Sequence, residues 1–209
     1  GPIEDRLRIL REVLAAVRAA VGKDYPVWVK LDSREFGKTD GISLEDAKFA
    51  ARTVEDAGAD AITVSAYHDT GNGKLHSESN IPHVENFNLP AAAEMKAEVS
   101  IPIIASGRIE VDTADRTIEK GDADFIAMGR KLLADPHLPN KLLRGETDRV
   151  RPCVYCYTCV SAIYGGQQSR CAVNAEFSVE FERKAATAAK KNIVIVGGGP
   201  GGMEATRRL

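Results

Sequence analysis

The sequence predicts an α/β fold in which parallel strands alternate with helices, followed by a cysteine-rich segment and the beginning of a second α/β unit. Three observations predict it. Short apolar, β-branched runs recur up to residue 128, and each pair of runs is separated by a segment with helix signals. All four cysteines fall between residues 153 and 171. A further apolar run then leads into a glycine-rich loop near residue 197.

The composition is that of an ordinary globular protein. The 209 residues are 44% hydrophobic and 28% charged, and the net charge is −2, so electrostatics indicates neither nucleic acid nor an anionic membrane as a partner. There is no apolar run of about 18 residues that could cross a bilayer. Cysteines gathered in one segment favour a reducing compartment, the cytoplasm, over a secreted disulfide scaffold. We expect a small-molecule substrate, and a homo-oligomer is compatible with these data.

Helices are predicted from periodicity and capping signals. An opening helix that ends at Gly22 carries apolar residues three and four positions apart on one face: Leu7, Leu10, Leu14, Val17 and Val21. Ser43 with Asp46 resembles a capping box for a helix over about residues 44–57, which Gly58 ends. The remaining helices are expected near residues 90–98 and 112–120, and after Asp135-Pro136.

Four apolar runs lie between these helices. We expect strands at residues 27–31, 61–65, 101–105 and 124–128. Because the runs are β-branched with little polar alternation, they predict a parallel sheet that is buried on both faces. The spacing fits either an open doubly wound sheet or half of an eight-stranded β/α barrel, and the pattern alone does not separate the two.

Glycine and arginine follow the last two predicted strands. Gly107-Arg108 comes after the third strand and Gly129-Arg130 after the fourth. Either pair alone is as well explained by an ordinary turn. Together, at successive strand ends, they indicate the phosphate site of a β/α barrel, because backbone N–H groups must approach the anion closely.

The cysteines have the spacing of a metal-cluster site. Cys153, Cys156 and Cys159 form a C-x2-C-x2-C run, and Cys171 follows after eleven intervening residues. Two-residue spacing lets a tight turn present consecutive sulfurs to one centre, and a distant fourth cysteine can complete a [4Fe–4S] cube. A zinc site is the main alternative, although structural zinc sites pair their cysteines two and two. Two disulfides are the third interpretation.

A glycine loop closes the chain. After a charged, alanine-rich linker over residues 177–191, the apolar run 193–196 predicts a buried strand, and Gly197-x-Gly199-x-x-Gly202 leads from it into a helix. This strand–loop–helix context is that of a dinucleotide-binding fingerprint, and a plain glycine-rich turn is the alternative. We therefore divide the chain into a partial barrel (1–150), a cluster segment with its linker (151–190) and the start of a dinucleotide-binding domain (191–209).

The order of these parts resembles the iron–sulfur branch of the old yellow enzyme (NADH:flavin oxidoreductase) family, which includes 2,4-dienoyl-CoA reductase and trimethylamine dehydrogenase. Residues 1–6, GPIEDR, resemble the G-x-x-E-N-R segment of that family, with Asp5 in place of the usual Asn. Ala134-Asp135-Pro136 and Arg151-Pro152-Cys153 are also similar. The resemblance implies the C-terminal half of a TIM (β/α)8 barrel, a 4Fe-4S segment and the first βα turn of a Rossmann-like FAD/NAD-binding domain.

The resemblance also implies cofactors and a reaction. FMN would bind the barrel, with Lys30 beside flavin N1 and the C2 oxygen and with Gly107, Arg108, Gly129 and Arg130 at its phosphate. The [4Fe–4S] cluster would lie beside it, and FAD or another ADP-containing nucleotide would bind the following domain. In the reductases, electrons pass from NAD(P)H through FAD and the cluster to FMN, which reduces an activated C=C bond. Amine dehydrogenase or demethylase activity on the same scaffold is the alternative, and a non-catalytic, zinc-stapled binding domain is the third.

The residues that donate protons in such enzymes have no counterpart here. The resemblance assigns the catalytic acid to strands that would precede residue 1. We therefore expect this sequence to be a piece of a longer enzyme and to be inactive when expressed alone.

Overall fold

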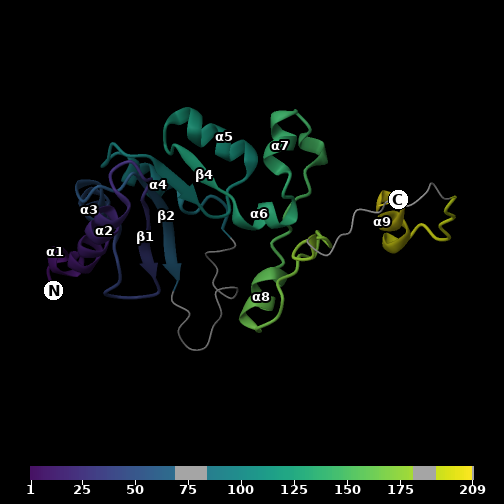
Figure 1. Ribbon diagram of the computed structural model, residues 1–209, viewed down its shortest axis with the longest axis horizontal. Helices are drawn as coiled ribbons and strands as arrows, with labels where there is room; N and C mark the ends of the chain where they lie inside the picture. Colours follow the sequence, from purple (N-terminus) through teal and green to yellow (C-terminus); the bar gives the residue numbers. More distant parts are fainter. Residues whose placement is uncertain (69–83, 181–191, 209) are drawn as a thin grey trace. The chain divides into compact units, whose positions relative to one another are not determined.

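The computed structural model describes residues 1–68, 84–180 and 192–208, and it divides into two units, Gly1–Phe177 and Ser178–Leu209. The first unit contains a four-stranded parallel sheet formed by β1 (Trp28–Phe36), β2 (Ala61–His68), β3 (Ile103–Ser106) and β4 (Phe125–Ala127). The strands lie side by side in chain order, β1-β2-β3-β4 (Figure 1). A doubly wound sheet reverses its strand order at a switch point, so the sequential order favours the barrel interpretation.

The predicted helices are present, with shifted ends. The described helices of the first unit are α1 (Ile3–Arg6), α2 (Arg8–Val21), α3 (Leu44–Asp56), α4 (Leu89–Lys96), α5 (Val111–Lys120), α6 (Gly129–Ala134), α7 (Leu138–Leu143), the 3-10 helix η3 (Thr147–Arg149) and α8 (Thr158–Tyr164). The predicted capping box of α3 is confirmed: the Ser43 hydroxyl accepts from Asp46 N at 3.1 Å, and the Asp46 carboxylate accepts from Ser43 N at 3.0 Å. Among these helices, none is long and apolar enough to cross a membrane.

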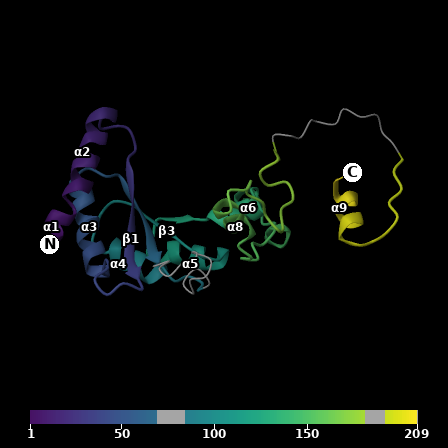
Figure 2. The ribbon, with the colours of Figure 1, turned by 90° about the horizontal axis from the view of Figure 1, so that it is seen from below.

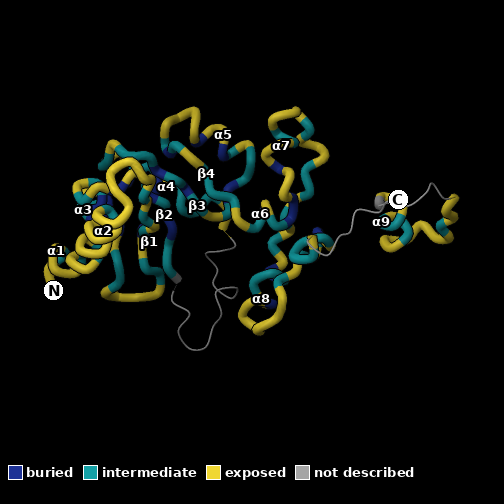
Figure 3. Tube along the Cα trace, in the orientation of Figure 1, coloured by how far each residue is buried: buried dark blue, intermediate teal, exposed yellow. Residues whose placement is uncertain are grey.

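The core lies on one face of the sheet. Alternate strand residues point into it and pack against small and apolar side chains of helices α3, α4 and α5. Figure 2 shows these helices beside the sheet, and Figure 3 marks the buried positions in dark blue. The buried members are Ile62, Val64, Ile103 and Ala105 on the strands and Ala47, Ala51, Val54, Ala92, Met95 and Ala114 on the helices. This unit therefore has a single helical layer in its described part.

In the described part of the chain the opposite face of the sheet is open, which corrects the prediction that the strands are buried on both faces. Trp28 and Phe125 are 60% and 58% exposed, and Lys30 is exposed as well. Each βαβ crossover has the same hand, so successive helices return to the same side of a sheet whose strands are laid down in order. The opening helix also departs from its pattern: Leu14 is buried, whereas Val17 and Val21 are 39% and 40% exposed.

The second unit holds the glycine loop and helix α9 (Pro200–Arg208). The predicted strand at residues 193–196 is not formed, and Val194 and Val196 are 86% and 95% exposed. A strand needs a neighbour for its backbone hydrogen bonds, and the described part of this unit offers none. The rest of the predicted linker, residues 181–191, lies outside the described residues.

Candidate functional site

Lys30 lies on the open face of the sheet, within β1. It pairs in register with Thr63 of β2, and side chains at every second residue of a strand share a face, so Lys30 and Asp32 point to the same side. Asp32 lies two residues further towards the C-terminal end of β1, and its carboxylate accepts a hydrogen bond from the Ser65 hydroxyl. The predicted cation is therefore presented on this face, below the carboxyl edge of the sheet.

Gly107 and Arg108 leave the sheet at the end of β3. Gly107 has φ +135°, a conformation that favours glycine, which explains the residue type at this turn. Arg108 donates from Nη2 to the Glu85 carboxylate at 3.0 Å, and its guanidinium carbon lies 3.9 Å from the centre of the Tyr155 ring. Arg108 is therefore held between a carboxylate and an aromatic face.

Gly129 and Arg130 begin helix α6 after β4. No heavy atom lies within 4 Å of the position that a Cβ would take at Gly129, so the backbone is accessible there. The Arg130 guanidinium lies 5.1 Å from the Tyr155 ring centre and 4.7 Å from that of Tyr157. Its Nη1 is buried without a hydrogen-bond partner among the described residues. A buried guanidinium donor next to an open glycine suits a bound anion such as a phosphate.

Tyr155 brings the two predicted phosphate arginines to one ring, which the sequence did not predict. Its hydroxyl donates to Glu110 at 3.0 Å, and the other oxygen of that carboxylate pairs with Lys131 at 2.5 Å. Although burial disfavours the charged form of Glu110, the hydrogen bonds from Lys131 and Tyr155 hold its pKa below the usual value. Burial raises the pKa of the Tyr155 hydroxyl, so this phenol stays protonated at neutral pH.

The four cysteines are brought together. All four are free thiols and line one small cavity, which is completed by Arg130, Leu133, Val154, Tyr155, Tyr157, Ala172 and Val173. Among the described residues, no group of three or more His, Cys, Asp or Glu side chains is placed to hold a single metal ion. The four cysteines thus share one cavity, and no three of them are placed to ligate a single metal ion.

The backbone of this segment turns twice in an unusual conformation. Tyr155 and Tyr157, which are not glycines, have φ +51° and +59°. Such residues cost free energy and cluster at functional sites, and here they alternate with the cysteines that face the cavity. The Cys156 sulfur and the Thr158 hydroxyl share a hydrogen bond at 3.2 Å, and this contact lowers the pKa of the Cys156 thiol. Burial raises the pKa of the Cys159 thiol.

In the second unit, the glycine loop joins an extended segment to helix α9. Gly197 has φ +109°, which suits the tight turn. A Cβ on Gly202 would lie 2.0 Å from the carbonyl oxygen of Gly197, so only glycine fits there, whereas the Cβ position of Gly199 is open. The predicted dinucleotide-binding fingerprint needs a tight turn, an open backbone and a close contact at its three glycines, and it also needs a preceding strand, which is not formed at residues 193–196.

Comparisons with known proteins show the family to which the chain belongs. Residues 1–149 match the NADH:flavin oxidoreductase / NADH oxidase family. Over 99% of its length, the chain is 35% identical to a metal reductase of Desulforamulus reducens, 36% identical to N,N-dimethylglycine/sarcosine dehydrogenase of Chromohalobacter salexigens and 34% identical to cinnamate reductase of Clostridium sporogenes. It covers 31%, 31% and 33% of those proteins, so it spans about a third of the length of the curated relatives it matches.

Two solved structures are similar over nearly the whole chain. A complex of 2-naphthoyl-CoA reductase with 2-naphthoyl-CoA has a TM-score of 0.87 and 28% identity, covering 99% of this chain and 32% of that one. Histamine dehydrogenase from Rhizobium sp. 4-9 has a TM-score of 0.81 and 26% identity, covering 99% and 30%. Both similarities continue past residue 149, through the cysteines and the glycine loop.

The glycine loop makes a first prediction. Gly202→Ala places a Cβ against the Gly197 carbonyl and should abolish retention of an ADP-containing nucleotide by the full-length gene product. Gly198→Ala, a matched control with nothing within 4 Å of its Cβ position, should leave that content unchanged. The measurement is FAD or other nucleotide released per chain on denaturation. Equal loss in both variants, or in neither, would contradict the assigned geometry.

The arginine at α6 makes a second prediction. Arg130→Ala should weaken FMN binding, because a charge-assisted hydrogen bond to phosphate contributes about 1.5–3 kcal/mol, roughly a 10- to 100-fold change in Kd. Arg116→Ala removes an exposed arginine that bonds only Thr113 in the described contacts and serves as the control. Fluorescence titration of the apoprotein with FMN measures both. An unchanged Kd for Arg130→Ala would show that Gly129-Arg130 is an ordinary turn.

Proposed function

Because the chain belongs to the NADH:flavin oxidoreductase / NADH oxidase family, we propose that it forms part of a flavin- and iron–sulfur-dependent reductase that uses NAD(P)H to reduce an activated carbon–carbon double bond. The observation that carries this proposal is the likeness to 2-naphthoyl-CoA reductase, which extends over 99% of the chain, beyond the family match, and has a higher TM-score than the likeness to histamine dehydrogenase, 0.87 against 0.81. A cinnamate reductase among the relatives supports the same substrate class, an unsaturated acid or thioester.

The open face and carboxyl edge of the sheet would hold FMN. Backbone N–H groups at Gly107 and Gly129, with the guanidinium of Arg130, would bind its phosphate. Lys30 supplies a cation on the open face, where it would stabilise negative charge on a reduced flavin ring. When bound, FMN would supply hydride chemistry, and the cluster and an ADP-containing flavin would supply electron transfer from NAD(P)H.

The cysteine cavity would hold a [4Fe–4S] cluster. In a cube each thiolate binds a different iron at a different corner, so the sulfurs surround the cluster. Four thiols around one cavity suit that arrangement, whereas a zinc ion needs all four ligands within about 2.3 Å of one point. Arg130, whose Nη1 atom is buried, lines the same cavity and would offset part of the negative charge of four thiolates.

An amine dehydrogenase or demethylase is the second candidate. It is favoured by the 36% identity to N,N-dimethylglycine/sarcosine dehydrogenase and by the similarity to histamine dehydrogenase. The same cofactor-binding residues would serve it, with electrons leaving the flavin towards an external acceptor. The third candidate, a non-catalytic binding domain held together by a zinc site, predicts a colourless protein that contains zinc and no iron.

The cluster assignment is tested by metal analysis. The full-length gene product, prepared anaerobically, should carry about four irons and four sulfides per chain. Cys156→Ser should lose the cluster and keep FMN, because the thiolate is a ligand and the phosphate residues lie outside the cysteine segment. Ser161→Ala, an exposed change on α8 in the same segment, is the control. Iron that persists undiminished in Cys156→Ser would contradict the ligand assignment.

The reaction is tested by substrate-dependent electron flow. We expect the full-length enzyme to oxidise NADH or NADPH when an aromatic enoate is added, and Lys30→Gln to lower this rate by about tenfold or more because a charged donor is lost. Lys30→Arg, which keeps the cation, should retain most of the activity. If an N-methylated amine instead drives reduction of an external dye and enoates do nothing, the second candidate replaces the first.

A further inference from the structure

We propose that Asp135 and Asn174 are positioning residues that fasten the two ends of the four-cysteine segment to the C-terminal end of helix α6 and so hold the thiols around one cavity. The inference rests on the proposed function in that it assigns those thiols to a cluster. The contacts that carry it are made by backbone groups, Asp135, Arg151 and Asn174, and none of them uses a cysteine sulfur.

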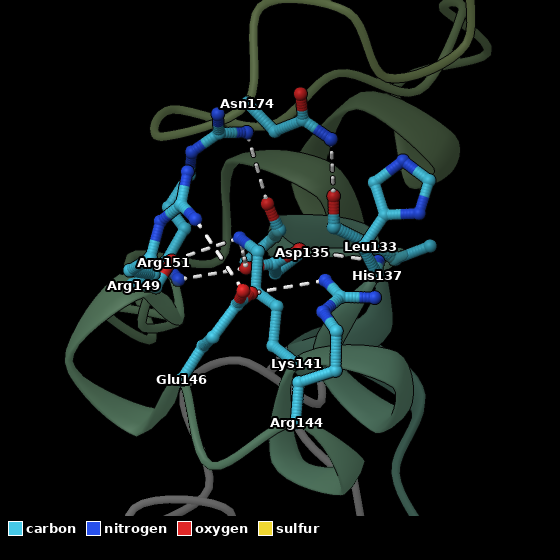
Figure 4. A network of polar contacts seen from close by, with 10 residues as sticks. Leu133, Asp135, His137, Lys141, Arg144, Glu146, Arg149, Arg151 and Asn174 are labelled. Atoms are coloured by element: carbon cyan, nitrogen blue, oxygen red, sulfur yellow. Dashed lines mark hydrogen bonds and ion pairs between the residues drawn. The ribbon is translucent and has the colours of Figure 1, made fainter.

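The first end is fixed by a buried carboxylate. Asp135 is 2% exposed and accepts hydrogen bonds from Lys141 Nζ at 2.6 Å and from the backbone N–H of Arg151 at 2.8 Å (Figure 4). The Arg151 guanidinium also donates to Ala134 O at 3.2 Å. Pro152 follows; its ring fixes its own φ and restricts Arg151 to extended conformations. Because the backbone at these two residues is restricted, anchoring Arg151 also fixes the position of Cys153.

The second end is fixed by a buried amide. Asn174 is 3% exposed, and its Nδ2 donates to the carbonyl oxygen of Leu133 at 2.8 Å (Figure 4). Its Oδ1 accepts from Glu176 N at 3.2 Å, which fixes the orientation of the amide. Asn174 lies three residues after Cys171, and Leu133 itself lines the cysteine cavity.

The end of a helix is suited to this task. The last carbonyl groups of a helix have no hydrogen-bond donor within the helix. In α6, the Asn174 amide donates to Leu133 O and the Arg151 guanidinium donates to Ala134 O. Both ends of the segment thereby meet at three consecutive residues, 133–135. Closing a loop costs conformational entropy, so a segment whose ends are already joined loses less on ligating a shared cluster.

The same helix links the two proposed cofactor sites. Gly129 and Arg130, at the start of α6, belong to the flavin phosphate site, and residues 133–135 at its end hold the cysteines. A helix of six residues is about 9 Å long and stiff. Although Arg130 contacts the cysteine segment, the backbone N–H groups at Gly107 and Gly129 lie outside it, so loosening the C-terminal contacts of α6 should disturb the environment of the cluster more than the binding of the flavin phosphate.

The test uses the full-length holoenzyme with one variant for each end. Asp135→Asn keeps the shape but removes the charge and an acceptor, and Asn174→Asp replaces the donor to Leu133 O with an acceptor. Arg151→Ala, at a partly exposed side chain, is a milder third variant. Glu146→Gln is the matched control, because Glu146 lies in the same polar network but pairs only with Arg144 and Arg149 in the contacts shown.

Two readouts are measured: the rate at which the cluster absorbance bleaches in excess chelator, and the midpoint potential of the cluster by redox titration. We expect Asp135→Asn and Asn174→Asp to lose the cluster about tenfold faster than wild type and to shift its potential, with FMN content retained and Glu146→Gln unchanged. If either Asp135→Asn or Asn174→Asp does not fold, the same two readouts on the remaining variant and on Arg151→Ala test the positioning role.

The outcomes separate this inference from the proposed function. A wild-type protein without iron would overturn the proposed function, and this inference with it. Iron-loaded variants with wild-type bleaching rates and an unchanged potential would overturn the positioning role alone. Variants that lose FMN and cluster together, with a lowered unfolding temperature, would show a general structural role and would also overturn it.

Discussion

Parallel pairing of β3 with β4 is the constraint on which the candidate site depends. Ser106 pairs with Ala127 in register, so both strands end at the same edge of the sheet. Gly107-Arg108 and Gly129-Arg130, separated by more than 20 residues in the sequence, therefore emerge side by side. Helix α6 begins at this edge, and its far end carries the cysteine segment, so strand register sets the position of both proposed cofactor sites.

Buried charges at this edge are compensated in pairs. Lys131 is 9% exposed and pairs with Glu110, which also accepts from Tyr155, and Asp135 pairs with Lys141. Burial of an unpaired charge costs far more free energy than a hydrogen-bonded pair recovers, so each ion needs its partner in place. These pairs hold α6, the end of β3 and the cysteine segment in a single arrangement, and they hold the arginines against the aromatic rings.

The relatives include reductases of unsaturated compounds and dehydrogenases of amines. Both reaction types need a flavin held at its phosphate, and the residues proposed for that task lie on the sheet edge and α6. The direction of electron flow depends on the substrate and on the electron donor or acceptor. The proposed scaffold could therefore serve both, and what favours the reductase is the higher TM-score to 2-naphthoyl-CoA reductase, 0.87 against 0.81 for histamine dehydrogenase.

The sequence by itself determined the elements and the chemical groups. Periodicity and the Ser43 cap predicted the helices, the apolar runs predicted the four parallel strands, and the spacing of the cysteines and glycines predicted which residues would gather. These signals are local, because a helix face, a cap or a C-x2-C turn is set by neighbours within a few residues.

Only the tertiary structure decided how those parts meet. It showed one helical layer where two buried faces were expected, no strand at residues 193–196, and both arginines stacked on Tyr155. Glu110, Lys131, Asp135 and Asn174 acquired their roles from partners 6 to 45 residues away, including Tyr155 for Glu110 and Leu133 for Asn174. Contacts at such separations depend on strand order and register, which leave no periodic trace in the sequence.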